Sequence, residues 1–200
     1  MTSALSQSLT KEAWNRADNR LANGVGSGSL ARIYRQHQLR FARVLEVDTS
    51  LGLTPNVKVQ YLDWAEEDAQ VYGSQVQPLT RGWIEDMKDR FDDIASMFDS
   101  EPGQPIIKNT PAKLKNGATA GSLVRIYKNH SLRFARVLAV KQSFPTQPNV
   151  EIQYFDNDRE RARVFGSVVV PVDAGWVDAL RQRLAIAETH LVARRQAQQG

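Results

Sequence analysis

The sequence predicts a mainly β protein with added helices, built from two tandem five-stranded barrels that are each followed by an amphipathic helix. The strongest observation is an internal repeat. Gly28–Tyr34 returns as Gly121–Tyr127, and 32 of the 63 positions in 28–90 are identical to the position 93 residues later. Self-similarity over this length indicates that one structural unit occurs twice. Short alternating segments separated by turns in each copy favour a small closed barrel over a sandwich.

Five short strands are expected in each copy. In the second of them, the period-2 pattern places Ala42 and Val44 on one face and Phe41 on the other. Polar turns and a proline-containing loop separate the segments. The expected strands of the first copy are Leu30–Tyr34, Arg40–Val47, Val57–Leu62, Ala69–Tyr72 and a short segment ending at Pro78.

A helix is expected after each barrel, because Thr80 and Asp173 are favourable N-cap residues that follow a proline by two positions. The second helix is expected to extend to about Gln196, and a further helix to begin near Ser8 or Thr10. Apolar residues at spacings of three and four predict one buried face per helix. They are Trp83, Met87, Phe91, Ile94 and Phe98 in the first helix, Trp176, Leu180, Leu184, Ala187 and Leu191 in the second, and Trp14, Ala17 and Leu21 in the N-terminal one.

These elements divide the chain into four parts. The stretch between the copies is rich in proline and glycine, which is typical of a linker. The expected parts are an N-terminal helical extension (1–27), the first barrel with its helix (28–98), the linker (99–120), and the second barrel with a long C-terminal helix (121–200).

The composition argues against several kinds of site. The chain has no cysteine, so it has neither disulfides nor thiolate metal ligands. His37 and His130 lie in equivalent polar turns without a nearby carboxylate or second histidine, and His190 lies alone on the expected last helix. No phosphate loop, nucleophile elbow or zinc spacing occurs. We therefore expect no enzyme, no cofactor and no metal. No apolar run approaches the length of a membrane span and no secretory signal is expected at the N-terminus.

The two copies differ in charge. The net charge of the chain is +4, but residues 28–98 carry 8 basic and 11 acidic residues, whereas residues 121–200 carry 12 and 7. The first copy is thus acidic and the second basic. This asymmetry favours different partners for the two copies.

Three segments of the first copy carry a family pattern. They are Arg40–Leu45 (RFARVL), Val59–Trp64 (VQYLDW) and Val76–Leu79 (VQPL). Together they resemble the Tudor domain, whose pattern is an aromatic and a small residue before a strand, then a strand ending near an acidic turn, then a Leu-Pro exit. The resemblance covers both copies, about half of the chain, and implies two Tudor-like barrels of the SH3 type. The glycine usual after the acidic turn is replaced by Ala65 and Asp158.

The resemblance implies an aromatic cage for methylated lysine or arginine in the first copy. Aromatic faces attract a bulky, weakly hydrated cation. The four cage positions correspond to Tyr34, Phe41, Tyr61 and Trp64, and Glu66 lies where the family often has a polar residue that contacts the ligand. Trp64 is the residue most expected to serve binding, because it lies in an acidic turn rather than in a strand.

The second copy departs from this pattern. It keeps three aromatic positions, but Asn157 replaces the fourth aromatic and Arg159 occupies the position of Glu66. A cation at that point repels a cationic ligand, so no methyl-reading is expected here. The aromatics that remain are Tyr127, Phe134 and Tyr154.

The basic second copy instead suggests an anionic partner. Arg159, Arg161 and Arg163 replace acidic or neutral residues of the first copy, and Phe165 lies beside them in the sequence. Basic residues interleaved with aromatics are typical of sites for single-stranded nucleic acid. An acidic protein surface is the alternative ligand.

The function expected from the sequence is thus a non-enzymatic tandem binding or adaptor protein whose first barrel reads methylated lysine or arginine. One alternative is a scaffold subunit of a large protein or ribonucleoprotein assembly, docked through long helices such as the one ending in 193–199. The other alternative is a nucleic-acid-binding module in the second barrel. The resemblance implies a eukaryotic protein with protein partners, in the nucleus or the cytoplasm or within an organelle.

Overall fold

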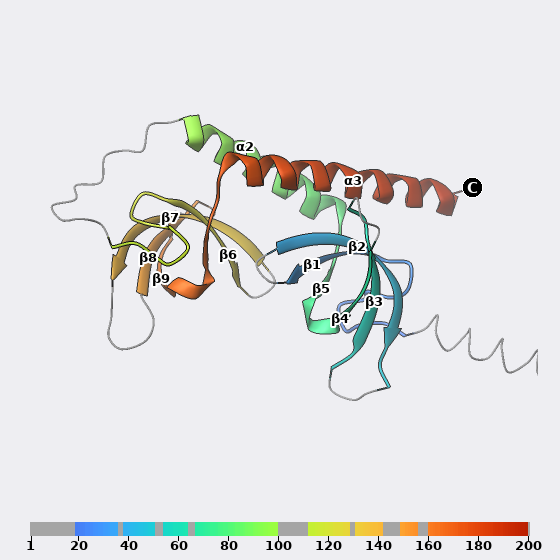
Figure 1. The fold of residues 1–200 in the computed structure, drawn as a ribbon. Coiled ribbons are helices and arrows are strands. Elements are labelled where there is room, and N and C mark those ends of the chain that lie inside the picture. Colours follow the sequence, from blue (N-terminus) through green and yellow to red (C-terminus); the bar gives the residue numbers. More distant parts are fainter. Residues whose placement is uncertain are drawn as a thin grey trace, which may run out of the picture. The chain divides into compact units, whose positions relative to one another are not determined.

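The fold is mainly β, with two five-stranded antiparallel sheets that are each followed by a helix (Figure 1). The computed structural model describes residues 19–35, 38–50, 54–63, 67–99, 112–128, 131–141, 149–155 and 160–199. The sequence prediction of two repeated β units, each with a helix after it, is confirmed.

The first sheet contains β1 (Leu30–Arg35), β2 (Gln38–Asp48), β3 (Asn56–Tyr61), β4 (Asp68–Tyr72) and β5 (Val76–Pro78). Its order is β4-β3-β2-β1-β5, so the first four strands form a meander and β5 returns to the edge of β1. A short 3₁₀ turn, Gly73–Gln75, joins β4 to β5. Among the described residues no strand pairing closes the sheet, and a closed barrel stays a prediction.

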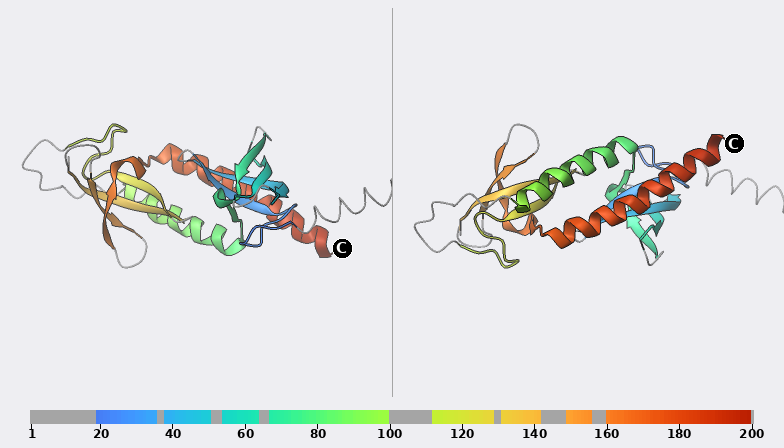
Figure 2. Two further views of the ribbon diagram at one scale, coloured as in Figure 1. Left: turned by 90° about the horizontal axis from the view of Figure 1, so that it is seen from below. Right: turned by 90° about the horizontal axis from the view of Figure 1, so that it is seen from above.

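The second sheet repeats the first. It contains β6 (Leu123–Lys128), β7 (Ser131–Lys141), β8 (Asn149–Tyr154), β9 (Arg161–Phe165) and β10 (Val169–Pro171), in the order β10-β6-β7-β8-β9. The register also repeats. The pairing shifts at the same place in both sheets, between Val44 and Glu46 and between Val137 and Ala139. Such a bulge increases the local twist of the strands, and both sheets are strongly twisted in Figure 2.

Two helices follow the sheets, α2 (Arg81–Asp99) and α3 (Ala174–Gln199). The predicted caps are confirmed, since the Trp83 N–H donates to Thr80 Oγ1 at 3.3 Å and the Trp176 N–H donates to Asp173 Oδ1 at 2.8 Å. Of the helices in the described residues, none combines the length and apolar character needed to cross a membrane. The expected N-terminal helix lies outside the described residues except for its last member, Leu21, which lies in a turn instead.

The core of each sheet lies on one face of it. In the first sheet, Ala42 and Val44 are fully buried together with alternate residues of the neighbouring strands, which confirms the predicted face of β2. The second sheet buries the equivalent side chains, Ala135 and Val137. Alternation along each strand therefore directs one set of side chains inward and leaves the other set on the outer face.

A turn that precedes the first strand of each sheet in the chain completes the core of that sheet. The Asn23 side chain donates to the Val76 carbonyl oxygen at 2.8 Å, and Asn116 makes the same contact with Val169. Each asparagine is followed by a glycine with positive φ, 82° at position 24 and 93° at position 117, which is a conformation that favours glycine. The turns bury Leu21 and Leu114, 93 residues apart. The repeated unit thus begins near residue 20 in the first copy, and residues 112–120 add core contacts although the sequence suggests a linker there.

The chain divides into two compact units. The described part of the first comprises residues 19–89 and 180–199, and the described part of the second comprises residues 90–179. The boundaries fall within the helices. Each unit therefore combines one sheet with residues from both α2 and α3.

Candidate functional site

Tyr61 at the end of β3 has a cation of its own chain on its ring. The Arg40 guanidinium carbon lies 3.4 Å from the Tyr61 ring centroid, and Arg40 Nε and Nη2 each donate to a carboxylate oxygen of Asp63 at 2.7 Å. Glu67 lies 3.6 Å from the same guanidinium. Tyr61 is paired with Ala42 across the strands, and Arg40, two residues from Ala42, shares its face. The contact is therefore set by the register of β2 and β3.

The charges of this cluster stabilise one another. Burial acts to lower the pKa of the Arg40 guanidinium, but its hydrogen bonds and charge attraction to Asp63 outweigh burial and raise that pKa. Burial raises the pKa of the Tyr61 phenol, although the neighbouring Arg40 acts in the opposite direction. Arg40 is thus held as a cation over a neutral ring.

The second repeat has the same arrangement. The Arg133 guanidinium carbon lies 3.4 Å from the Tyr154 ring centroid, and Arg133 Nη2 donates to Glu160 Oε2 at 3.0 Å. The contact recurs although the second repeat lacks the fourth aromatic of the expected cage. We conclude that the arginine–tyrosine stack belongs to the fold of the repeat.

Phe41 lies on the opposite, outer face of the first sheet. It is paired with Arg32 across the strands and is buried, with its ring 5.9 Å from that of Trp83 in an edge-to-face arrangement. The Arg32 guanidinium lies 4.7 Å from the Trp83 ring centroid. Tyr34, two residues after Arg32, shares this outer face and is half-buried. The structure brings Tyr34 and Phe41 to one face of the sheet and Tyr61 to the other.

The remaining two residues of the expected cage, Trp64 and Glu66, lie outside the described residues. The full cage stays a prediction. What the described residues add is that Phe41 packs against α2 and that one face of Tyr61 is covered by Arg40.

Phe134 of the second repeat also packs against helix residues. Its ring lies 6.2 Å from Phe91 of α2 and 6.1 Å from Trp176 of α3, both edge-to-face. The Arg125 guanidinium lies 4.2 Å from the Trp176 centroid, and its Nη1 donates to the Pro171 carbonyl oxygen at 2.7 Å. This part of the outer face is therefore buried under helix side chains.

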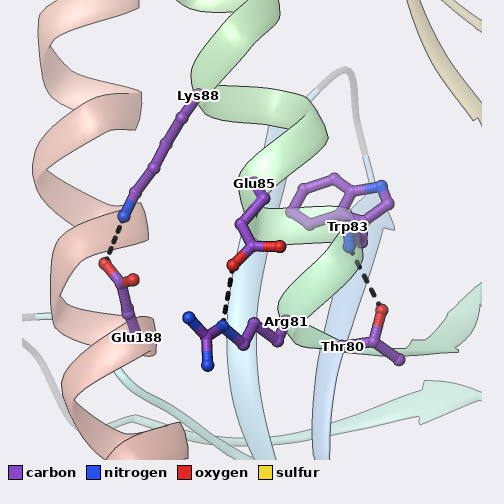
Figure 3. A network of polar contacts seen from close by, with 6 residues as sticks. All are labelled: Thr80, Arg81, Trp83, Glu85, Lys88 and Glu188. Carbon is purple, nitrogen blue, oxygen red and sulfur yellow. Dashed lines mark hydrogen bonds and ion pairs between the residues drawn. The ribbon is translucent and has the colours of Figure 1, made fainter.

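Ion pairs hold the helix residues of the first unit together (Figure 3). Lys88 Nζ of α2 lies 2.6 Å from Glu188 Oε2 of α3, and within α2 the Arg81 Nε lies 2.7 Å from Glu85 Oε1. All four side chains are exposed, so each pair contributes only about 0.2–1 kcal/mol. These contacts are structural.

The other part of the second sheet's outer face carries the predicted arginines. Arg161, Arg163 and Phe165 alternate along β9 and are all exposed, Phe165 by 60%. Each of these three residues is paired with a residue of β8, which is in turn paired with a residue of β7, so the face consists of three rows. The rows are Arg161–Gln153–Arg136, Arg163–Glu151–Ala139 and Phe165–Asn149–Lys141. We call these nine residues the β7–β9 face. Arg159, the third predicted arginine, lies outside the described residues.

The first sheet presents the same nine positions with different charges. Its rows are Asp68–Gln60–Arg43, Gln70–Lys58–Glu46 and Tyr72–Asn56–Asp48, which we call the β2–β4 face. This face has two cations and three carboxylates, a net charge of −1, whereas the β7–β9 face has four cations and one carboxylate, a net charge of +3. Tyr72, 59% exposed, is the counterpart of Phe165. Local sequence patterns do not identify Tyr72 or Lys141 as surface binding residues, because their place on these faces depends on the register.

Ion pairs join neighbouring side chains on both faces, and the Glu151 side chain is half-buried. Lys141 Nζ and Arg163 Nη2 lie 2.7 Å and 3.1 Å from Glu151 Oε1, and the hydrogen bond from Lys141 is the main cause of the lowered pKa of Glu151. On the first sheet, Lys58 lies 3.3 Å from Asp68. One carboxylate thus offsets one of the four cations of the β7–β9 face and leaves the others in excess.

No model of a known protein family matches this chain, and no curated protein matches it. In the described ranges, no group of three or more histidine, aspartate or glutamate side chains is placed to hold a metal ion. The β2–β4 face and the β7–β9 face, which have opposite net charges, are the candidate binding sites.

Proposed function

We propose that this chain is a non-enzymatic adaptor made of two Tudor-like barrels whose outer faces bind different partners. The β2–β4 face and the β7–β9 face are the two binding surfaces. The resemblance of the strand motifs to Tudor domains supports the barrel assignment, since it accounts for the strand order from β1 to β5 and for its repetition.

The observation that carries the proposal is the difference between two equivalent faces. The repeats keep their internal contacts, such as the arginine–tyrosine stacks at Tyr61 and Tyr154. They keep an exposed aromatic at Tyr72 and Phe165. Around that aromatic the net charge changes from −1 to +3. Complementary charge determines which partner docks on a surface, so the two faces suit partners of opposite sign.

The competing function is a scaffold subunit of a large assembly, with no aromatic cage that binds a ligand. Binding of methylated lysine or arginine by the first repeat stays a further proposal. The packed positions of Phe41 and Tyr61 favour an adaptor over a cage reader. Both rings have structural partners, and those partners recur in the second repeat, where no cage is expected.

The test uses a photoreactive amino acid at Gln60 or at Gln153. These identical residues occupy the same uncharged position in the first row of each face. We expect the two variants to crosslink to different partners in an extract of the source cells. The same set of partners at both positions, or no light-dependent adduct at either, would contradict an adaptor with two distinct faces.

A further inference from the structure

We infer that the partner of the β7–β9 face is a single-stranded nucleic acid, with phosphates bound by the cations of β7 and β9 and a base stacked on Phe165. This inference rests on the proposed adaptor function and names the ligand class of one of its two surfaces. The groups required are a cluster of cations, an aromatic side chain among them, and exposure of both to solvent.

The cations form the electrostatic part of the site. Arg161 and Arg163 alternate along an edge strand, so both side chains leave the same face. Lys141 joins them two strands away because the bulge between Val137 and Ala139 shifts the alternation of β7. The side chains of Arg163 and Lys141 are 73% and 57% exposed. When these cations bind phosphates in place of Glu151, the counterions of the nucleic acid are released. This release drives nucleic-acid binding.

Phe165 selects nucleic acid over an acidic protein surface. It lies at the end of the row that contains Lys141, with Asn149 between them, and next but one to Arg163 along β9. A large exposed apolar ring lowers the solubility of a protein. A base can stack on such a ring in a nucleic acid of any sequence. Unpaired bases are needed for this contact, so a single strand fits better than a duplex.

The rest of the outer face indicates where the ligand lies. The part around Phe134 is covered by Phe91 and Trp176, and among the described residues of this face the exposed cations lie on the far end of β7 and on β9. Arg136 is the member of the face nearest the covered part and contacts the Gly121 carbonyl oxygen at 3.4 Å. The single-stranded nucleic acid is therefore expected to run along β9, over Arg161, Arg163 and Phe165.

The experiment measures binding of the full chain to a fluorescent oligouridylate of about 12 nucleotides, a length within the range covered by one small β domain. Phe165→Ala is expected to weaken binding about 5- to 150-fold, the effect of losing one stacked base. Arg161→Gln with Arg163→Gln is expected to lower the slope of log K against log salt by about 1.4, since each phosphate contact on a single strand contributes about 0.7.

The first repeat supplies the matched controls. Tyr72→Ala removes the equivalent aromatic from the β2–β4 face and should leave binding unchanged. Asp68→Arg with Gln70→Arg installs the two arginines beside Tyr72 and should add affinity and raise the salt slope. All six positions are exposed, so the variants are expected to keep the melting temperature and circular dichroism of the parent.

Three results would overturn the inference. They are an unaltered salt slope in the arginine variant, equal binding of a duplex with no effect of Phe165→Ala, and equally tight binding of an oligoglutamate peptide, which would indicate an acidic protein partner. In the last case the light-dependent adduct at Gln153 would persist and the adaptor function would stand without a nucleic acid.

Discussion

Replacing Asp63 by asparagine should destabilise the first sheet locally. Asp63 accepts two hydrogen bonds of 2.7 Å from Arg40, and the paired guanidinium lies on the Tyr61 ring. Asp63→Asn keeps one acceptor oxygen but removes the negative charge. The Arg40 cation then stays over a buried ring without its main counter-charge, because an arginine side chain keeps its proton at neutral pH.

The expected loss follows from the exposure of the pair. Hydrogen bonds to charged groups contribute about 1.5–3 kcal/mol, whereas an exposed ion pair contributes about 0.2–1 kcal/mol. The side chains of Arg40 and Asp63 are only 23% and 13% exposed, so the pair belongs nearer the first range. Because one acceptor remains, we expect Asp63→Asn to lower the local free energy of unfolding by about 1.5–2.5 kcal/mol.

Hydrogen exchange resolves this effect sheet by sheet. Amides of β2 and β3 should exchange at least about tenfold faster in Asp63→Asn, while those of β7 and β8 keep their rates and act as an internal control. Glu85→Gln removes the same charge from an exposed pair and should change stability by less than about 0.5 kcal/mol. Equal effects of the two variants, or equal acceleration in both sheets, would refute the reasoning.

Three further predictions concern the cage, the turns and pH. Trp64→Ala should abolish binding of methylated lysine and arginine peptides without unfolding the chain, as followed by fluorescence against Trp64→Phe; unchanged binding would remove the cage. Asn116→Ala removes the bond to Val169 and should cost the second sheet about 1–2 kcal/mol by hydrogen exchange, with Asn23→Ala doing the same in the first; a loss confined to neither sheet would contradict the role of the turn. The raised pKa of Tyr61 means that the folded state holds the phenol proton more tightly than the unfolded chain, so the contribution of Tyr61 to stability should be lost as pH rises above 10.0. In denaturant unfolding over that range, the free energy of unfolding of Tyr61→Phe should therefore fall less steeply than that of the parent.

The strands and caps could be predicted because local patterns determine them. Alternation located β2 with Ala42 and Val44 inward, and the polar residue after each Pro-x pair identified the caps Thr80 and Asp173. The turns at Asn23 and Asn116 carry no local pattern that assigns them to the repeat. An Asn-Gly pair with a single buried leucine beside it has no periodicity, so it resembles a linker. The offset of 93 residues between the two pairs was the signal that could have revealed them.

The surfaces could not be predicted because they depend on register. The resemblance to Tudor domains assigns Phe41 and Tyr61 to the same expected cage. The pairing of Ala42 with Tyr61 instead places the two rings on opposite faces of the sheet. Likewise Lys141 and Arg136 are five residues apart and would lie on opposite faces of a regular strand. The bulge between Val137 and Ala139 brings them to one face. A one-residue shift in strand pairing of this kind cannot be predicted from the amino-acid composition.

The two repeats offer an internal test of which contacts serve the fold. A contact present in both copies, such as the guanidinium stacked on Tyr61 and on Tyr154, persists on sheets of opposite charge and so has no need of a particular ligand. Tyr61 is buried with the Arg40 guanidinium on its ring, so a methylated side chain would have to displace Arg40 from Asp63 to reach it. That displacement would cost the stabilisation that Asp63→Asn is designed to measure. The charged positions around Tyr72 and Phe165 behave in the opposite way, because the aromatic is retained while its neighbours change sign. Differences of that kind contribute little to folding on an exposed face, and the proposed pair of partners would account for them.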